Sequence, residues 1–239
     1  MGSKLSIIMP CYNEGDWIYR NLHEAVKSFK ELNLNFEIIV VDDGSTDSTY
    51  SEAKKVNTMY TKIVRYDQNK GKGHALKHGL SFATGDYITF LDADLDIHPR
   101  QIMTLIRYME EFGSDIVIAS KRHPDSKVIY PLKRKILSSA YHLFVDLLFG
   151  LDVKDTQTGL KLLKKECASV VLPKVLVKRY AFDLELLVLC RKYNFRIKEA
   201  PVEIKYNFSG SGINLTALKN IFQDTLAIAY RLYILRYYG

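Results

Sequence analysis

An Asp-x-Asp segment carries the clearest metal-binding chemistry in the sequence. Asp92 and Asp94 are separated by one residue, and they directly follow an apolar run at 87–91. Two carboxylates at the end of a strand can point into one cleft, and Mg²⁺ prefers such oxygen ligands, which it shares with substrate phosphates. Asp96 follows closely and could complete the set. A solvated turn is the alternative interpretation, and the position after a predicted strand favours the metal.

Two further polar segments could hold a nucleotide. Asp42 and Asp43 follow an apolar run of β-branched residues, and a carboxylate there can accept hydrogen bonds from a ribose hydroxyl or a base N–H. The next residues, Ser45 and Asp47, fit a helix cap at least as well. The glycine-rich, basic segment 69–73 suits an approach to a phosphate. It lacks the pattern of a Walker loop, and no dinucleotide fingerprint follows the first predicted strand.

The elements that must position these side chains alternate between strands and helices through the first half of the chain. The predicted strands are the apolar runs at 4–9, 36–41, 62–66, 87–91 and 115–119, and a helix is predicted after each of the first four. This order predicts an α/β fold with a doubly wound, mostly parallel sheet flanked by helices. Ligands of such sheets bind beyond the carboxyl ends of the strands, which is where the polar segments fall.

The second half is less regular and ends in an aromatic-rich amphipathic segment. Its predicted features are an apolar segment with a basic start at 133–151, a helix at 182–192 and a strand at 195–205. Pro201 predicts an edge or a break in that strand. We expect one domain over 1–214, followed by an amphipathic helix over 215–239 that lies on a membrane surface or in an interface.

Composition limits the classes of function. The 239-residue chain is 47% hydrophobic and 26% charged, which is typical of a globular protein and excludes wholesale disorder. Its formal net charge of +7 favours an anionic partner such as a phosphate ligand, an acidic membrane surface or nucleic acid. The three cysteines are far apart and lack metal-ligand spacing, so we expect neither a disulfide framework nor a zinc site.

Four segments occur in the order typical of the family 2 inverting glycosyltransferases with the GT-A fold, and the chain resembles that family over about residues 4–210. The segments are PCYNE at 10–14, VVDDGSTD at 40–47, NKGKGHAL at 69–76 and DAD at 92–94. The resemblance implies a nucleotide site made by Pro10, Tyr12, Glu14, Asp43, Lys70 and Asp92. It also implies that Asp94 and Asp96, with Asp92 beside them, hold Mg²⁺ or Mn²⁺ on the donor diphosphate.

Segments of the second half narrow the resemblance to the polyprenyl-phosphate glycosyltransferases. These segments are SKR at 120–122, DTQTGLK at 155–161 and FDLEL at 182–186. The second of them is most similar to its counterpart in dolichyl-phosphate glucosyltransferases. The resemblance implies a UDP-sugar donor, with UDP-glucose favoured, and a polyprenyl or dolichyl phosphate acceptor. The segment 207–212 lacks a basic residue that the family commonly has there, and Lys205 is the candidate substitute.

The chemistry of such a transfer agrees with the available residues. A phosphate oxygen is already anionic near neutral pH, so the enzyme mainly has to orient it and neutralise two close anions. Arg122 and Arg134 are candidates for the acceptor phosphate, because the arginine fork donates two parallel hydrogen bonds. Ser138 lies one helical turn after Arg134. A solvated basic helix start is the alternative interpretation of Arg134.

Asp155 and Gln157 are expected to line the sugar or acceptor side of the site, where Asp155 could act as a base. The predicted catalytic set is therefore Asp94, Asp155, Gln157 and Arg122. A second hypothesis keeps the enzyme and replaces the acceptor by a glycan or lipid hydroxyl, whose deprotonation requires a base such as Asp155. A third hypothesis is a non-catalytic module that binds nucleotide sugar or nucleic acid. The intact aspartates argue against it, and no nucleic-acid partner is expected.

A lipid acceptor raises the question of membrane contact. The sequence contains no uncharged apolar stretch near the roughly 18 residues that a spanning helix needs. The segments 133–151 and 215–239 combine basic residues with apolar and aromatic ones, which is typical of helices that lie on a membrane surface. We therefore expect a cytoplasmic protein, peripheral on the cytosolic face of a membrane. Burial of these segments in the core or in a homo-oligomer interface is the alternative.

Overall fold

The computed structural model describes residues 2–128, 132–178, 181–204 and 215–239, and the side chains of 132–138 and 215–218 fall outside this description. The strands are β1 (Leu5–Cys11), β2 (Phe36–Asp42), β3 (Thr61–Arg65), β4 (Tyr87–Phe90), β5 (Ile116–Ser120), β6 (Lys127–Val128), β7 (Lys161–Lys164), β8 (Ile197–Pro201) and β9 (Glu203–Ile204). The α-helices are α1 (Ile18–Glu31), α2 (Thr49–Lys55), α3 (Lys72–Leu80), α4 (Ile102–Phe112), α5 (Leu132–Phe149), α6 (Lys165–Val171), α7 (Phe182–Lys192) and α8 (Leu215–Ala229). Single turns of 3-10 helix lie at Pro99–Gln101 and Leu172–Lys174, and a π-helical turn at Tyr230–Ile234 follows α8.

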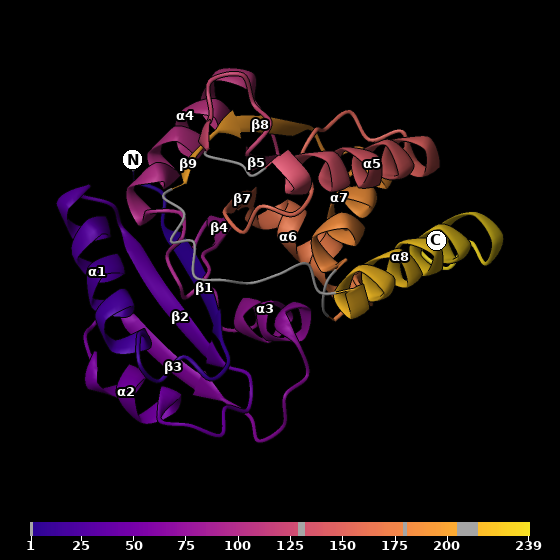
Figure 1. Ribbon diagram of the computed structural model, residues 1–239. Helices are drawn as coiled ribbons and strands as arrows, with labels where there is room; N and C mark the ends of the chain where they lie inside the picture. Colours follow the sequence, from indigo (N-terminus) through magenta and orange to yellow (C-terminus); the bar gives the residue numbers. More distant parts are fainter. Residues whose placement is uncertain (1, 129–131, 179–180, 205–214) are drawn as a thin grey trace.

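A seven-stranded sheet in the order β3-β2-β1-β4-β7-β5-β8 forms the centre of the molecule (Figure 1). Strands β1 to β4 pair in parallel, and β8 pairs in parallel with β5. The prediction of a doubly wound, mostly parallel sheet is confirmed. Pro201 ends the edge strand β8, as its place in the sequence predicted.

The sequence did not predict β7, which runs antiparallel between β4 and β5. This strand has only four residues, Lys-Leu-Leu-Lys, which do not alternate between charged and apolar, so their pattern does not indicate a strand. Its first residue, Lys161, is fully buried, contrary to the usual exposure of lysine. Because β7 is antiparallel, it begins at the edge where its neighbours end.

Helices cover both faces of the sheet. Alternate residues of a strand point to opposite faces, and in β1 the side chain of Ile8 belongs to one apolar cluster while Ile7 and Met9 belong to the other. The first cluster contains residues of α3, α6 and α7, and the second contains residues of α1, α2 and α4. Two continuous cores thus hold the sheet rigid, and its edge carries the polar segments.

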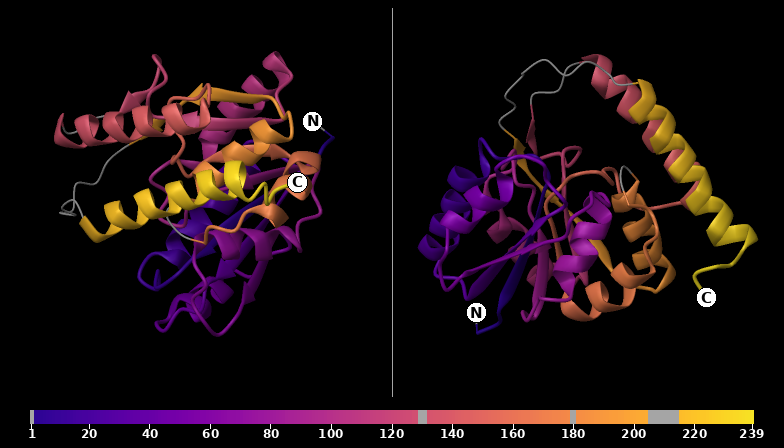
Figure 2. Two further views of the ribbon diagram at one scale, coloured as in Figure 1. Left: turned by 90° about the vertical axis from the view of Figure 1, so that its right-hand side faces the viewer. Right: turned by 90° about the horizontal axis from the view of Figure 1, so that it is seen from below.

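Helices α5 and α8 pack against each other on the side of the first cluster, to which they contribute Val145, Phe149 and Ile228 (Figure 2). The Tyr141 hydroxyl lies 2.9 Å from the Thr225 hydroxyl, and the rings of Phe144 and Phe222 are 5.3 Å apart. A C-terminal helix was predicted over 215–239, and the structure has α8 followed by a π-helical turn. The predicted domain boundary at residue 214 lies outside the described residues.

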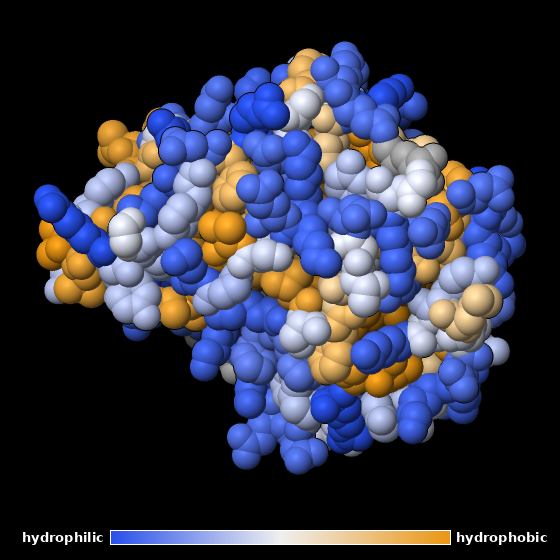
Figure 3. Space-filling model, turned by 180° about the vertical axis from the view of Figure 1, so that it is seen from behind, coloured by the Kyte–Doolittle hydropathy of each residue, from blue (hydrophilic) through white to orange (hydrophobic). Residues whose placement is uncertain are grey.

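Apolar side chains remain exposed on both helices of this pair. Leu143 and Leu147 of α5 are 70% and 84% exposed, and Leu226 of α8 is 54% exposed. Tyr230 and Ile234 continue the exposed surface beyond α8. Figure 3, which views the molecule from behind, shows hydrophobic residues on its left-hand edge. Within the described ranges, no helix combines the length and the apolar character that crossing a bilayer requires.

Candidate active site

Five chain segments meet at one edge of the sheet. β1 ends at Cys11 beside Asp42, the last residue of β2. β4 ends at Phe90, which pairs with Lys161 at the beginning of β7. β5 ends at Ser120 on the far side of β7. The polar segments that follow or precede these residues therefore come together, as the sequence predicted.

Asp92 forms an ion pair that the sequence analysis did not foresee. The Lys72 ammonium at the beginning of α3 lies 2.6 Å from Oδ1 of Asp92. Burial disfavours the charged form of Lys72, but the charges of Asp92 and Asp183 outweigh that effect and raise the pKa of Lys72. Lys72 is therefore a permanent cation at the centre of the acidic segment.

Gly159 permits the close approach of the Asp92 carboxylate. A Cβ atom added at Gly159 would lie 1.9 Å from Oδ2 of Asp92, so no side chain fits there while Asp92 keeps its position. The two oxygens of Asp92 are thus confined, one by Lys72 and the other by the backbone of 159. The motif 155–161 contained this glycine, but its partner could be identified only once β7 placed the motif beside Asp92.

The three predicted metal ligands line one pocket of about 120 Å³, together with Lys121 and Gln157. The Asp96 N–H donates to Oδ1 of Asp94 at 3.1 Å. Desolvation raises the pKa of Asp94, and repulsion from Asp92 and Asp96 adds to it, against the effect of that hydrogen bond. The pocket therefore concentrates negative charge.

The negative charge of the pocket extends to the first loop of the chain. Burial raises the pKa of Glu14, and the charges of Asp94, Asp47 and Asp92 raise it further. A carboxylate of the loop after β1 and the carboxylates after β4 are thus close enough to repel one another. A divalent cation would relieve this repulsion.

The donor set fits Mg²⁺ or Mn²⁺ shared with a ligand. Across the described ranges, no group of three or more His, Cys, Asp or Glu side chains is arranged to hold a metal by itself. Mg²⁺ is commonly held by one or two carboxylates with substrate phosphates supplying further oxygens. Asp94 and Asp96 are suited to that role. Asp92 differs because its Oδ1 is engaged by Lys72, so its predicted metal contact stays a prediction.

Asp155 organises the loop that carries Gln157. Its carboxylate accepts hydrogen bonds from the Lys121 N–H at 2.9 Å, the Thr158 hydroxyl at 2.6 Å and the Gln157 N–H at 3.1 Å. These bonds tie the loop before β7 to the end of β5. Gln157 reaches the acidic pocket as predicted. The geometry gives Asp155 a positioning role, and its action as a base stays a prediction.

A buried ion pair lies below this loop. Lys161 Nζ is 2.8 Å from Oδ1 of Asp183 and also donates to the carbonyl of Thr158. The Lys161 side chain is fully buried and that of Asp183 is 11% exposed. Both residues stood in motifs noted in the sequence, but their contact depends on β7 and α7 meeting in space. The pair fixes the loop on which Gln157 and Gly159 lie.

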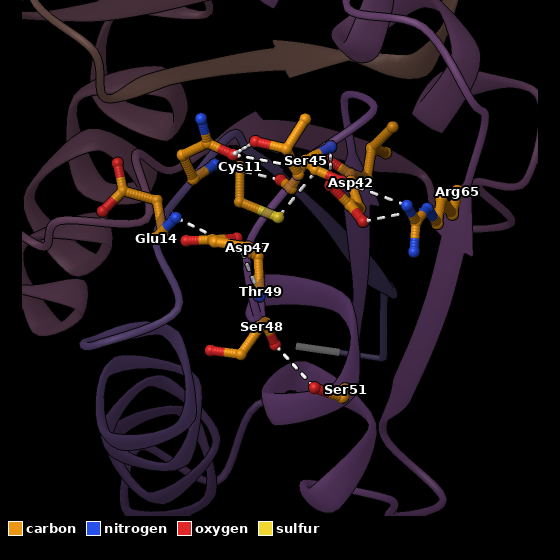
Figure 4. A network of polar contacts seen from close by, with 12 residues as sticks. Cys11, Glu14, Asp42, Ser45, Asp47, Ser48, Thr49, Ser51 and Arg65 are labelled. Atoms are coloured by element: carbon orange, nitrogen blue, oxygen red, sulfur yellow. Dashed lines mark hydrogen bonds and ion pairs between the residues drawn. The ribbon is translucent and has the colours of Figure 1, made fainter.

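The loops after β1 and β2 are joined by a polar network (Figure 4). The Asn13 N–H donates to Ser45 Oγ at 2.9 Å, and the Gly15 N–H donates to Asp47 Oδ2 at 3.0 Å. The Thr49 hydroxyl accepts from the N–H of Glu14 at 2.7 Å. The Glu14 carboxylate itself extends away from the network in Figure 4. The end of β1, with the predicted nucleotide residue Pro10, and the loop after it, with Tyr12 and Glu14, are thus bonded to the loop after β2, and Tyr12 is 43% exposed.

Asp43 supports the glycine-rich loop. Its buried carboxylate accepts hydrogen bonds from the Tyr66 hydroxyl at 2.6 Å and from the N–H groups of Lys70 and Gly71 at 2.7 and 2.8 Å. The Lys70 ammonium lies 5.5 Å from the centre of the Tyr66 ring and lines a different hollow, beside α8. Lys72, and not Lys70, is the residue of this loop that reaches the acidic pocket. Nucleotide contacts of Asp43 and Lys70 stay predictions.

The predicted acceptor residues lie on the side of β5. The Arg122 guanidinium donates to the Ser139 hydroxyl of α5 at 3.3 Å, which places it beside the first half of that helix. The side chains of Arg134 and Ser138 lie outside the described residues. Since α5 carries both of them, the structure brings Arg122 to the helix that the acceptor hypothesis requires.

Comparisons with known proteins agree with this geometry. The sequence profile described as Glycosyl transferase family 2 matches residues 6–182. A dolichyl-phosphate beta-glucosyltransferase of Dictyostelium discoideum is 35% identical over 213 residues, which cover 83% of this chain and 65% of that protein. A protein of the same description from Trichomonas vaginalis is 31% identical over 248 residues, which cover 96% of this chain and 75% of that protein. The chain thus spans just under two thirds of the Dictyostelium protein.

A solved structure confirms the fold. Glucosyl-3-phosphoglycerate synthase of Mycobacterium tuberculosis, in complex with Mn²⁺, UDP and phosphoglyceric acid, superposes with a TM-score of 0.70 at 20% identity, over 96% of this chain and 78% of that one. The fold is therefore GT-A, as the motifs implied. The profile match shows that the chain belongs to glycosyl transferase family 2, within which it is similar over most of its length to dolichyl-phosphate beta-glucosyltransferases.

Proposed function

We propose that the protein transfers glucose from UDP-glucose to the phosphate of a polyprenyl or dolichyl lipid, with inversion at the anomeric carbon and with bound Mg²⁺ or Mn²⁺. The observation that carries the proposal is the pocket in which Asp94 and Asp96 lie beside the Lys72–Asp92 ion pair, at the carboxyl edge of a GT-A sheet. The names of the relatives from Dictyostelium and Trichomonas support the acceptor and the sugar.

The donor side of the site is suited to a sugar diphosphate. Asp94 and Asp96 would hold the metal, which when bound stabilises the negative charge that develops on the leaving diphosphate. Lys72 supplies a second positive charge at the same place and is oriented by Asp92. The fold neighbour from M. tuberculosis, solved with Mn²⁺ and UDP, supports this arrangement.

The acceptor side has to hold an anion and needs no strong base. A phosphate monoester is ionised near neutral pH, so the attacking oxygen does not have to lose a proton to the enzyme. Arg122, with Arg134 on α5, would neutralise and orient this phosphate. Asp155 would act through the loop that it holds, because its carboxylate is already bonded to three donors.

The lipid tail of the acceptor requires contact with a bilayer. Apolar residues of α5 and α8, among them Leu143, Leu147 and Leu226, are exposed. Exposed Lys219 and Arg236 lie along the same C-terminal segment, and basic residues near an anionic leaflet contribute about 1 kcal/mol each. We infer that this surface rests on the cytosolic leaflet, where the protein is peripheral.

A donor panel tests the proposal. Purified protein is incubated with a short-chain polyprenyl phosphate, Mg²⁺ or Mn²⁺, and UDP-glucose, UDP-galactose or GDP-mannose, and the lipid fraction is analysed by mass spectrometry. We expect a hexosyl phospholipid with UDP-glucose, and its loss in Asp94→Asn or with chelator. Glu110→Gln, on the exposed side of α4, is the matched control. Release of free sugar alone would contradict the proposed acceptor.

A further inference from the structure

Glu185 is a buried carboxylate that the proposed chemistry does not use. It lies in the first half of α7 and is fully buried. Its Oε2 accepts hydrogen bonds from the backbone N–H groups of Leu176 and Val177 at 2.7 and 2.6 Å. Its Oε1 accepts from Arg231 Nη2 at 2.9 Å and from the Tyr238 hydroxyl. A buried carboxylate is costly unless it is paired and fully hydrogen-bonded, and here four donors meet that need.

One side of this cluster is the last part of the described chain, residues 231–238, which we call the C-terminal hook. Arg231 Nε also donates to the Tyr238 hydroxyl at 2.8 Å, so the two ends of the hook are joined to each other as well as to Glu185. The Tyr193 hydroxyl at the end of α7 donates to the carbonyl of Tyr238. The hook therefore closes over α7 and fixes the orientation of α8, from which it continues.

The other side of the cluster leads to the donor pocket. The segment 176–178, which Glu185 holds, packs against the beginning of α3. The Gly73 N–H donates to the carbonyl of Lys178 at 2.9 Å. A Cβ atom at Gly73 would lie 2.7 Å from the carbonyl of Val177 and 2.5 Å from the ring of Phe182, so this contact leaves no free space. Gly73 is covalently joined to Lys72, whose ammonium pairs with Asp92.

We propose that the C-terminal hook is a positioning element for the donor site, and that Glu185 connects the hook to Lys72 through the segment 176–178 and Gly73. The inference rests on the proposed function in that it takes the Lys72–Asp92 pair as part of the donor site. Arg231, Tyr238 and Glu185 do not line the pocket that contains Asp92, Asp94 and Asp96. They set the position of the α3 N-terminus, and with it the place of the Lys72 ammonium.

The physical basis is the cost of an incompletely satisfied buried carboxylate. When a hydrogen-bond donor of the hook is removed, the Glu185 carboxylate has to bind water or another donor in its place. The segment 176–178 is bonded to the same carboxylate, so it is displaced when the carboxylate moves. The hydrogen bond from the Gly73 N–H to the carbonyl of Lys178, with Val177 and Phe182 packed closely on Gly73, transmits that displacement to α3. The hook continues from α8, so contact of α8 with a surface and occupation of the donor site are expected to influence each other.

The test compares Tyr238→Phe with Tyr237→Phe in the full chain. Tyr237 is the adjacent, 59% exposed tyrosine, and its change removes the same hydroxyl outside the cluster. Affinity for UDP in the presence of Mn²⁺ is measured by calorimetry, and amide hydrogen exchange is followed in peptides that cover 70–76 and 172–178. We expect Tyr238→Phe to weaken UDP binding about fivefold and to speed exchange at both segments. Tyr237→Phe should change neither.

A second pair of variants distinguishes a positioning role of the hook from a general effect on stability. Arg231→Met removes the charged donor, and Arg191→Met, at the exposed end of α7 and outside the Glu185 cluster, is its control. In turnover assays the KM for UDP-glucose should rise in Arg231→Met while the KM for the lipid phosphate stays constant. Unchanged UDP affinity and unchanged exchange at 70–76 in folded Tyr238→Phe would overturn the inference. If wild-type protein fails to bind UDP, the proposed donor is wrong, and the exchange at 70–76 still decides whether the hook and the α3 N-terminus are coupled.

Discussion

Among single residues, Asp92 and the charged groups around it are the most important for the proposed donor site. Three aspartates share a small pocket, and one of them is paired with a lysine whose own pKa is raised by that contact. This pairing gives Asp92 a different role from that of Asp94 and Asp96. Asp92 pairs with Lys72, and in the proposed site Asp94 and Asp96 remain to share a cation with a diphosphate.

Lys72→Met should abolish most of the transfer activity while the protein stays folded. The ion pair is partly exposed, with about a third of each side chain accessible, so its loss should cost little stability. The positive charge beside the diphosphate is lost altogether, and groups that stabilise developing charge commonly contribute about 100-fold or more to kcat. Steady-state kinetics beside thermal unfolding measures both effects. Lys165→Met, an exposed lysine at the beginning of α6 and outside the acidic pocket, is the comparison. An equal loss in both variants would contradict the assignment of Lys72.

Gly159→Ala should weaken metal-dependent donor binding while it leaves the stability of the protein nearly unchanged. The added methyl group would meet only the end of the Asp92 side chain, which can rotate away at small cost to folding. Asp92 would then leave Lys72, and metal-dependent donor binding should weaken at least about tenfold, while the midpoint of thermal unfolding moves by only a few degrees. Calorimetric titration with UDP and Mn²⁺ measures the first quantity. Full donor affinity in the variant would show that the position of Asp92 is unimportant.

At the scale of elements, the sequence predicted what periodicity and strand ends can reveal. The parallel strands β1 to β5, the helices between them and the convergence of Asp43, Asp92 and Asp94 at one edge followed from apolar runs that end in polar residues. Strand β7 could not be predicted, because four residues with lysines at both ends carry almost no periodic signal. The Lys161–Asp183 and Lys72–Asp92 pairs could not be predicted either. Each joins residues that are far apart in the sequence, and the spacing of residues along the chain does not reveal such contacts.

The Lys161–Asp183 pair should be important for the stability of β7 and its loop. Asp183→Ala leaves the Lys161 ammonium buried without its charged partner, and breaking a buried pair in this way costs about 3–5 kcal/mol. Replacing both residues, as in Lys161→Met with Asp183→Ala, should restore a large part of the lost free energy of unfolding. Urea denaturation of the two single variants and the double variant forms the thermodynamic cycle. Additive losses would mean that the two side chains do not interact.

Stability at acid pH should depend on Glu37 of β2. Its carboxylate accepts hydrogen bonds from Lys4 and Ser6 at the beginning of β1 and from Thr84 before β4. Burial works to raise the pKa of Glu37, but hydrogen bonds from Ser6, Thr84 and Lys4 outweigh it and lower the pKa to about 2. A carboxyl group whose pKa is lowered by folding stabilises the protein above its ordinary pKa of 4.5, and that contribution disappears as the pH falls toward 2.

Glu37→Gln provides the corresponding measurement. The amide cannot ionise, so the variant should be less stable than the wild type at pH 6, and the difference should shrink between about pH 4.5 and pH 2. Urea denaturation at a series of pH values follows this convergence. A difference in the free energy of unfolding that stays constant over the whole range would be inconsistent with the hydrogen bonds to Glu37.

In the molecule as a whole, the two apolar cores support the sheet, and the exposed faces of α5 and α8 form a separate apolar surface. The cores on the two faces hold a rigid sheet whose carboxyl edge carries the site. Helices α5 and α8 expose apolar side chains outward, and the hook joins α8 to α7 through Glu185. The molecule thus combines a fixed donor site with a surface suited to the layer in which a lipid acceptor resides.

The central claim is that Asp94 and Asp96 hold a metal on the diphosphate of the donor. A crystal grown with UDP and Mn²⁺, with diffraction recorded near the manganese absorption edge, tests it most directly. We expect an anomalous peak in contact with the Asp94 carboxylate and with the UDP phosphates, while the Lys72 ammonium lies beside them. UDP bound with its phosphates away from Asp94, or a manganese peak at another place on the chain, would contradict it.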